Sequence, residues 1–302
     1  MKKVLSISLG SKKRDHRVKT SICGQELLLE RRGTDGDKDE AKKLFAELDG
    51  CYDVFGIGGM DLYVFSGNHR YKIRETQKII QHAEKTPVVD GSGLKNTLER
   101  KVIADLSRQE IIDFSKKRVL IVSAVDRLGM AEALKKEGAD LRIGDLLFVL
   151  GLPLVLKSLR SLEIFTRITA PLIVKLPLRF LYPTGKKQEE NSSGWRYYRV
   201  YQQSEIIAGD FHLIKRFIPD QLKNKTIITN TVTEKDVELL QKKGLKTLIT
   251  TTPELEGRSF GTNLMEAACV ALAEKNDLPL ENEYYFSLLE EINFKPRIEE
   301  LN

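Results

Sequence analysis

Three stretches of the sequence combine charged residues and glycines in patterns that favour chemistry. The first spans residues 86–98, where Asp90 ends a short apolar run and precedes two glycines. A helix that opens at these glycines leaves backbone N–H groups free beside the carboxylate, and Lys95 follows one turn later. A carboxylate and an ammonium group held together can polarise a hydroxyl group and move its proton. The alternative is that Asp90 only caps the helix.

The second stretch, residues 119–145, has the order strand, turn, helix, strand that a dinucleotide site requires. Such a site brings backbone N–H groups to the pyrophosphate, and an acidic residue ~20 positions on binds the ribose. Here the usual glycines are replaced, so the alternative is a structural turn without a nucleotide. The predicted cofactor residues, from this stretch and the next two strand ends, are Ser123, Val125, Asp126, Gly129, Asp145, Asp210 and Thr231.

The third stretch, residues 250–267, places hydroxyl groups at a strand end before a loop and a helix, as the wall of a cleft does. Arg258 in the loop can pair with a carboxylate or a phosphate, unless the loop is only solvent-exposed. Glycines and serines at two earlier strand ends, and His212, add weaker candidates. The predicted substrate residues are Ser8, Ser11, Gly59, Arg258, Asn263 and Glu266.

Composition narrows the function classes. The 302 residues are 41% hydrophobic and 30% charged, which is typical of a globular protein and not of a disordered chain. The net charge of +6 is spread along the chain, so we expect no nucleic-acid surface. Three scattered cysteines predict reduced thiols, no metal site and a cytoplasmic protein. No apolar run is long enough for a signal peptide or a spanning helix.

Strand-like runs alternate with amphipathic stretches, which predicts an α/β fold with largely parallel sheets. We expect an N-terminal α/β domain over residues 1–105, the possible substrate domain. A doubly wound, Rossmann-like sheet follows over residues 106–275, and a helical tail over 276–302. Ligands of such a sheet bind at the carboxyl ends of its strands.

Residues 146–203 interrupt the alternation and are too long for a plain connection. Their first part is apolar and basic, and their second part is polar. A lid, a dimerisation arm and a helix on a membrane surface are the functional alternatives. An ordinary helical insertion packed on the sheet is the structural one.

Taken together, these stretches resemble the shikimate/quinate dehydrogenase family, and the chain looks like a bacterial group named quinate 5-dehydrogenase. Residues 89–94 are similar to the family's Thr-Asp-Gly-x-Gly-Leu segment, and residues 119–131 to its cofactor turn. Residues 229–244 and 261–267 resemble its closing units. The resemblance implies that Asp90 is catalytic and works with an upstream lysine. That lysine is unassigned here, and Lys72 or Lys95 could substitute for it. The cofactor glycines, the family's upstream lysine segment and any counterpart of residues 146–203 are missing.

Two functions follow. The first is an NAD-dependent oxidoreductase that acts on a ring hydroxyl of quinate, shikimate or a related anionic hydroxy acid. NAD is expected over NADP because the Asp145 carboxylate repels a 2′-phosphate. The second is a non-catalytic ligand-binding or interaction protein, whose insertion contacts a partner or a membrane surface. A homodimer is compatible with both.

Overall fold

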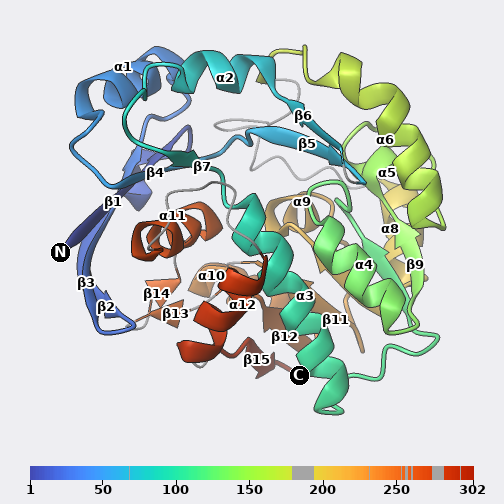
Figure 1. Ribbon diagram of the computed structural model, residues 1–302. Coiled ribbons are helices and arrows are strands. Elements are labelled where there is room, and N and C mark those ends of the chain that lie inside the picture. The colour runs from blue at the N-terminus through green and yellow to red at the C-terminus, as the bar shows by residue number, and fades with distance from the viewer. Residues whose placement is uncertain are drawn as a thin grey trace.

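The computed structural model is a mixed α/β structure built around two main sheets (Figure 1). It describes residues 1–67, 69–178, 194–230, 232–252, 254–255, 258–259, 261–273, 282–292 and 294–302. The predicted α/β class and the largely parallel pairing of the strands are confirmed.

The first sheet has five strands in the order β2-β3-β1-β4-β7. All are parallel except β2, which pairs antiparallel with β3. Val4 to Ser8 of the central strand are buried without a break, as expected for a strand covered on both faces. The strands are β1 (Lys2–Ser8), β2 (His16–Ile22), β3 (Gln25–Gly33), β4 (Val54–Gly58) and β7 (Val88–Val89).

We call the first sheet and the elements around it the first lobe. It includes the helices α1 (Lys38–Leu48) and α2 (Arg74–Ile80) and the hairpin of β5 (Tyr63–Ser66) and β6 (His69–Lys72). A 3-10 turn, η1 (Lys12–Arg14), follows β1. Asp37 caps α1 by accepting the N–H groups of its first turn. Phe45 of α1 packs edge-on against Phe55 of β4, with ring centres 5.5 Å apart. Ala41, Leu44, Phe45 and Leu48 recur at helical spacing, so the sequence itself indicates this helix.

The second sheet has six strands in the order β15-β12-β11-β10-β8-β9, and all but β15 are parallel. The chain enters at β8, moves outward to β9, and returns to the other side of β8 as β10. The gap between β8 and β10 is therefore a topological switch point. The strands are β8 (Arg118–Ile121), β9 (Asp140–Ile143), β10 (Ile206–Gly209), β11 (Thr226–Thr229), β12 (Thr247–Thr250) and β15 (Arg297–Glu300). The helices of this second lobe include α4 (Leu128–Lys136), α5 (Asp145–Phe148), α9 (Phe211–Arg216) and α10 (Glu234–Lys242).

Two helices join the lobes. Helix α3 (Ser92–Arg108) leaves the first sheet after β7 and leads into β8, and α12 (Asn282–Glu291) packs on it. Helix α11 (Thr262–Leu272) follows the short strands β13 (Glu254–Leu255) and β14 (Arg258–Ser259) and returns to β1 and β4 of the first sheet. Every residue from Leu264 to Leu272 is buried. A Cβ atom at Gly56 of β4 would lie 2.7 Å from the carbonyl oxygen of Asn263, so glycine allows this close approach.

The insertion runs back to the first lobe. Its helix α6 (Leu159–Ile173) packs against β5, where the hydroxyl groups of Ser66 and Thr166 lie 2.8 Å apart. Val174 and Leu178, just after α6, join the hydrophobic core of the first lobe. The later helix α8 (Trp195–Gln202) packs on the second lobe through Tyr201. Residues 179–193 of the insertion lie outside the described residues.

The predicted helical tail over residues 276–302 is wrong in its last part. After α12 the chain forms β15, whose residues 297–300 pair antiparallel with β12 and close that edge of the second sheet. Sequence reasoning also gave no strand to residues 16–22 and no hairpin to residues 63–72. Among the described residues, no helix combines the length and the apolar character needed to cross a membrane.

Candidate functional site

The carboxyl ends of both sheets open into one cleft with a volume of about 2740 Å³. Its walls come from the ends of β1, β4 and β7 in the first lobe and of β8, β10 and β11 in the second. The N-terminal ends of α3, α4 and α11 also line it, and in none of the three does the N-cap residue itself supply a side-chain hydrogen bond. Pockets for drug-sized ligands measure about 300–1,000 Å³, so this cleft has room for a larger compound.

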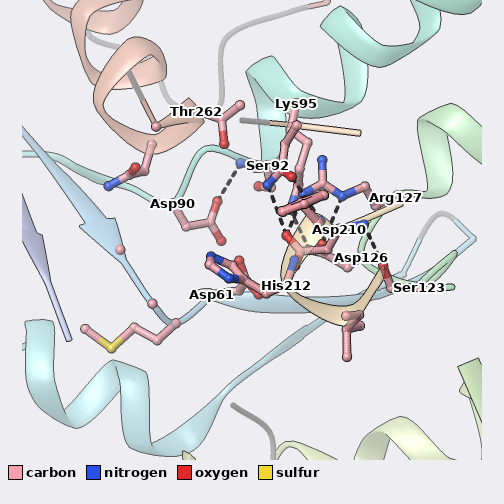
Figure 2. Close-up of a pocket in the computed structure, with 18 of the residues that line it drawn as sticks. Asp61, Asp90, Ser92, Lys95, Ser123, Asp126, Arg127, Asp210, His212 and Thr262 are labelled. Carbon is pink, nitrogen blue, oxygen red and sulfur yellow. Dashed lines mark hydrogen bonds and ion pairs between the residues drawn. The ribbon is translucent and has the colours of Figure 1, made fainter. Parts of the chain in front are cut away.

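Asp90 lies in the cleft wall at the end of β7 (Figure 2). One carboxylate oxygen accepts the N–H of Leu62 at 2.7 Å, and the other accepts the N–H of Ser92 at 2.9 Å. Gly91, between Asp90 and Ser92, has φ of +90° and lies against the start of α11. A Cβ atom added at Gly91 would come too close to the backbone nitrogen of Asn263. Asp90 therefore holds the start of α3, as the capping alternative predicts, and also lines the cleft.

Lys95 forms an ion pair with Asp126, with the ammonium nitrogen 2.5 Å from a carboxylate oxygen. The lysine side chain is 10% exposed and the Asp126 side chain 35%, so the aspartate is the more open partner. Burial lowers the pKa of Lys95, but the attraction of Asp126 and Asp61 outweighs it and leaves the pKa raised. Lys95 is thus a permanent cation and a hydrogen-bond donor. A role as acceptor of the substrate proton does not fit this state.

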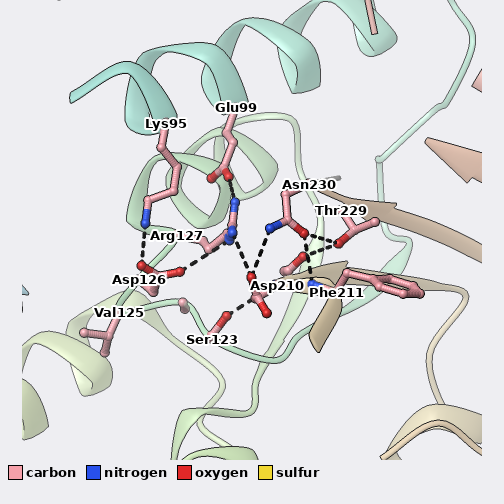
Figure 3. Close-up of polar contacts among 12 residues, drawn as sticks. Lys95, Glu99, Ser123, Val125, Asp126, Arg127, Asp210, Phe211, Thr229 and Asn230 are labelled. Carbon is pink, nitrogen blue, oxygen red and sulfur yellow. Dashed lines mark hydrogen bonds and ion pairs between the residues drawn. The ribbon is translucent and has the colours of Figure 1, made fainter. Parts of the chain in front are cut away.

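Arg127 is the centre of a buried ion cluster (Figure 3). Its guanidinium binds the Glu99 carboxylate on α3 and donates to Asp210 at 3.2 Å, at the end of β10. Asn230, at the end of β11, donates to the same Asp210 oxygen at 3.0 Å. Burial raises the pKa of Glu99, although the positive charge of Arg127 acts to lower it. The cluster fixes the switch point of the second sheet to α3.

A second buried carboxylate, Glu266, approaches the cleft from α11. It accepts a hydrogen bond from the Tyr285 hydroxyl at 2.9 Å, and its other oxygen has no partner among the described residues. Burial, with repulsion from Asp90, raises the pKa of Glu266 to about 8. The side chain is therefore protonated at neutral pH. One turn earlier on α11, Asn263 donates to the Ser6 hydroxyl of β1 at 2.5 Å.

The turn after β8 does not fit a pyrophosphate in the manner of a glycine-rich turn. Asp145 accepts the N–H groups of Ala124 and Val125 at 2.8 and 2.9 Å, so a carboxylate of the chain already occupies them. Burial raises the pKa of Asp145 to about 6. Gly129 lies against α3, where a Cβ atom would be 2.5 Å from the Asn96 carbonyl oxygen. Asp145 thus holds the turn, Gly129 permits helix packing, and their cofactor roles stay predictions.

Most of the other predicted residues line the same cleft. Ser8, Ser11, Gly59, Ser123, Val125, Asp126, Asp210, His212, Asn263 and Glu266 all do so. Lys72 does not: it is exposed on β6 and is not among the residues that line the cleft, and its role as the catalytic lysine stays a prediction. Thr231 and the side chain of Arg258 lie outside the described residues.

Sequence reasoning missed three residues of the site: Asp61, Glu99 and Asn230. A signal existed for Glu99, because it follows Lys95 by four residues and so lies on the same side of α3. Asn230 stands directly after β11, where side chains of a doubly wound sheet reach the ligand edge. For Asp61, after two glycines at the end of β4, only the three-dimensional arrangement shows its approach to Lys95.

Carboxylates outnumber cations at the centre of this cleft. Asp61, Asp90, Glu99, Asp126 and Asp210 stand against Lys95 and Arg127. Further basic side chains also line the wall, among them Lys13, Arg14, Arg70, Arg100 and Lys215. The described residues include no group of three or more His, Cys, Asp or Glu side chains that could hold a metal ion. The centre is therefore suited to accept hydrogen bonds from ligand hydroxyl groups.

A family model described as a domain of unknown function, DUF8754, matches residues 93–301. The chain belongs to the DUF8754 family. A second domain of unknown function, DUF8753, matches residues 3–90. The boundary between the two matches falls between Asp90 and Lys95, so the cleft takes residues from both. A search of the curated proteins finds no match to this chain.

Solved structures of two kinds resemble this chain weakly. A galactofuranose binding protein has 12% identity and a TM-score of 0.38, and the match covers 97% of this chain and 99% of that one. A periplasmic sugar binding protein from Legionella pneumophila has 10% identity and a TM-score of 0.35, over 92% and 97% of the two chains. The L-tryptophan dehydrogenase from Nostoc punctiforme has 10% identity and a TM-score of 0.34, over 89% and 68%. Likeness at this level carries no argument about the ligand of this chain.

Proposed function

We propose that the chain binds a small polyhydroxylated compound, a cyclic hydroxy acid or polyol, in the cleft between its two lobes. The observation that carries this proposal is the meeting of Asp90, Lys95, Asp126 and Asp210 in one cleft. Asp90 comes from the first sheet, Asp126 and Asp210 from the second, and Lys95 from the helix between them.

Asp126 and Asp210, which are more exposed than Asp90, have acceptor capacity left for a ligand. Asp126 uses one oxygen on Lys95 and the other on Arg127, and its side chain is 35% exposed. Asp210, 23% exposed, accepts from Arg127, Asn230 and the His212 N–H. An ionised carboxylate has about four lone-pair positions, so both can accept hydroxyl groups as well. Lys95 supplies a charged donor between them and the first lobe.

The test is calorimetric titration of the protein with quinate, shikimate and myo-inositol, beside cyclohexanecarboxylate as a ring acid without hydroxyl groups. We expect binding of at least one hydroxylated compound and none of cyclohexanecarboxylate. Asp126→Asn removes the charge that pairs with Lys95 and should weaken binding tenfold or more, about 1.4 kcal/mol. Asp140→Asn is the matched control, because Asp140 pairs with Arg142 away from the cleft wall. Equal binding of cyclohexanecarboxylate, or wild-type affinity of Asp126→Asn, would contradict the proposal.

The second candidate is an NAD-dependent oxidoreductase acting on a ring hydroxyl of quinate, shikimate or a related hydroxy acid. It is favoured by one observation: the switch point between β8 and β10, where doubly wound sheets bind their ligands, opens into the same cleft as Asp90. Against it stands the occupation of the Ala124 and Val125 amides by Asp145.

Titration with NAD and with NADP, each with and without quinate, tests the second candidate. Binding of NAD in preference to NADP, followed by growth of reduced-nicotinamide absorbance on addition of a hydroxy acid, would support it. If neither dinucleotide binds, the dehydrogenase candidate falls. The binding proposal is then still decided by the calorimetry of the hydroxylated compounds alone.

A further inference from the structure

Exposed apolar side chains gather in the insertion. Thirteen large apolar residues are exposed among the described residues, and ten of them lie between residues 149 and 198. These ten are Val149, Leu150, Leu152, Leu154, Ile164, Ile168, Leu172, Leu176, Trp195 and Tyr198. Single exposed apolar residues are normal on a protein surface, but a concentration in one segment marks an interaction surface.

Helix α6 carries the clearest part of this surface. Ile164, Ile168 and Leu172 follow one another at intervals of four, so they form a stripe along one side of the helix. They are 54%, 70% and 68% exposed. Leu162, Thr166 and Ala170 on the other side are buried, and Thr166 contacts Ser66 of the hairpin. The stripe is thus the outer side of a helix whose inner side already packs on the first lobe.

Basic residues flank the stripe. Lys157, Arg160, Arg167 and Lys175 are all exposed, and Glu163 is the one acidic residue of residues 155–178. Glu163 lies against the hairpin, since a Cβ atom at Gly67 would be 2.9 Å from its carboxylate. The outer side of α6 is therefore apolar with a positively charged margin.

The loop after α5 and the helix α8 continue this character. Phe148 at the end of α5 packs on Tyr197 and Tyr201 of α8, with ring centres 5.4 and 5.9 Å apart. The exposed apolar loop 149–154 therefore starts beside α8 and precedes α6 in the chain. Val149 and Leu150 of this loop also line the cleft. On α8, Trp195 and Tyr198 are exposed next to two exposed arginines. Tryptophan and tyrosine are the side chains that favour the interface between lipid and water.

We propose that the apolar stripe of α6 and its basic margin bind the surface of an anionic lipid bilayer, with α6 lying in the plane of the interface. Ile164, Ile168 and Leu172 are not among the residues that line the cleft. A helix of 15 residues with an apolar stripe and a basic margin suits the interface and is too short to span the hydrocarbon. A second copy of the chain is disfavoured, because basic margins would face each other. The proposal is independent of any ligand in the cleft.

The experiment is flotation of the full chain with vesicles of phosphatidylcholine alone and of phosphatidylcholine with phosphatidylglycerol. We expect binding to the anionic vesicles only, and its loss at about 0.5 M salt, where charge attraction is screened. The double variant Ile168→Glu with Leu172→Glu should bind at least tenfold less. Ile111→Glu is the matched control, because Ile111 is 44% exposed outside the insertion. Circular dichroism verifies that each variant is folded.

A charge variant separates the two parts of the surface. Arg160→Gln with Arg167→Gln keeps the apolar stripe and should weaken binding to the anionic vesicles about tenfold. The proposal is overturned if the wild-type chain floats with neither vesicle, or if the double glutamate variant binds like wild type. It is also overturned if size-exclusion chromatography shows a dimer that the glutamate variant dissolves, since the stripe would then be covered by a second copy.

Discussion

At the scale of single residues, the pairing of buried charges determines what the cleft offers to a ligand. The Arg127 side chain is 4% exposed and the Glu99 side chain 1%. A buried ion pair of this kind adds little net stability, because desolvation offsets the attraction, yet removal of one partner leaves a charge without compensation. The same reasoning makes Lys95 a fixed donor rather than a base, because Asp126 and Asp61 keep it protonated.

Arg127→Met should therefore lower the free energy of unfolding by about 3–5 kcal/mol, because Glu99 then lies buried and unpaired. The double variant Arg127→Met with Glu99→Leu should recover most of this loss. Urea denaturation of wild type, single and double variants gives the comparison. A single variant as stable as wild type would show that the pair does not hold α3 to the switch point.

Glu266 makes stability depend on pH. Its folded pKa is about 8, above the ordinary value of 4.5, so the folded state holds a proton that the unfolded state releases. Stability from this proton is complete below about pH 4.5 and is lost as the pH rises through about 8. Glu266→Gln should abolish this loss, and its advantage over wild type at about pH 9 should be on the order of a few kcal/mol. Parallel pH–stability curves of the two proteins would refute the assignment.

At the scale of elements, close contacts of helices bring the charges together. Helix α4 crosses α3 where Gly129 faces the Asn96 carbonyl oxygen. At the same place, Lys95 and Glu99 of α3 form ion pairs with Asp126 and Arg127, which lie in the turn just before α4. The lobes are held in place by α11, which starts beside Gly91 and packs along β1 and β4.

Gly129→Ala tests the contact of α3 and α4. Alanine gains about 1 kcal/mol in helix propensity, but its Cβ atom would lie 2.5 Å from a backbone oxygen that cannot move alone. We expect a net loss of roughly 1–3 kcal/mol in urea denaturation. Gly151→Ala, with φ of +71° and no atom within 4 Å, is the control and should lose only about 1 kcal/mol. A more stable Gly129→Ala protein would argue against the close contact.

At the scale of the whole molecule, the two sheets are not independent. The family matches divide the chain at residues 90 and 93, yet α11 from the second match packs its buried side chains on the first sheet. Removal of the second part would expose the faces of β1 and β4 that α11 covers.

Residues 1–91 expressed alone should therefore fail to form a cooperatively folded monomer. Co-expression with residues 92–302 should rescue solubility, and the two fragments should copurify. Solubility, circular dichroism and urea denaturation of each fragment provide the measurement. A cooperative unfolding transition of residues 1–91 by themselves would show that α11 is dispensable for the first lobe.

Local patterns predicted much of the architecture. Helix α10 and the strands β8, β10 and β12 follow from patterns of this kind. Their signals, such as the capping box of Thr233 and the apolar runs of buried strands, lie within one element. The strand β15 was missed, because this polar edge strand owes its pairing to β12, far away in the sequence. The hairpin β5–β6 pairs locally, but its second strand is polar and mostly exposed, so it lacks the apolar run that marks a buried strand.

By itself, the sequence determined the α/β class and the order of the main elements, because periodicity and chain order are local properties. It also determined that Asp90, Lys95, Asp126 and Asp210 lie near strand or helix ends. Only the tertiary structure decided which charges neutralise one another. Lys95 and Asp126 are 31 residues apart, and Arg127 and Asp210 are 83 apart. It also decided that Asp145, at the start of α5, binds the amides of the turn after β8, and that α6 returns to the first lobe. Electrostatic pairing and desolvation act through space, and sequence separation does not measure that distance.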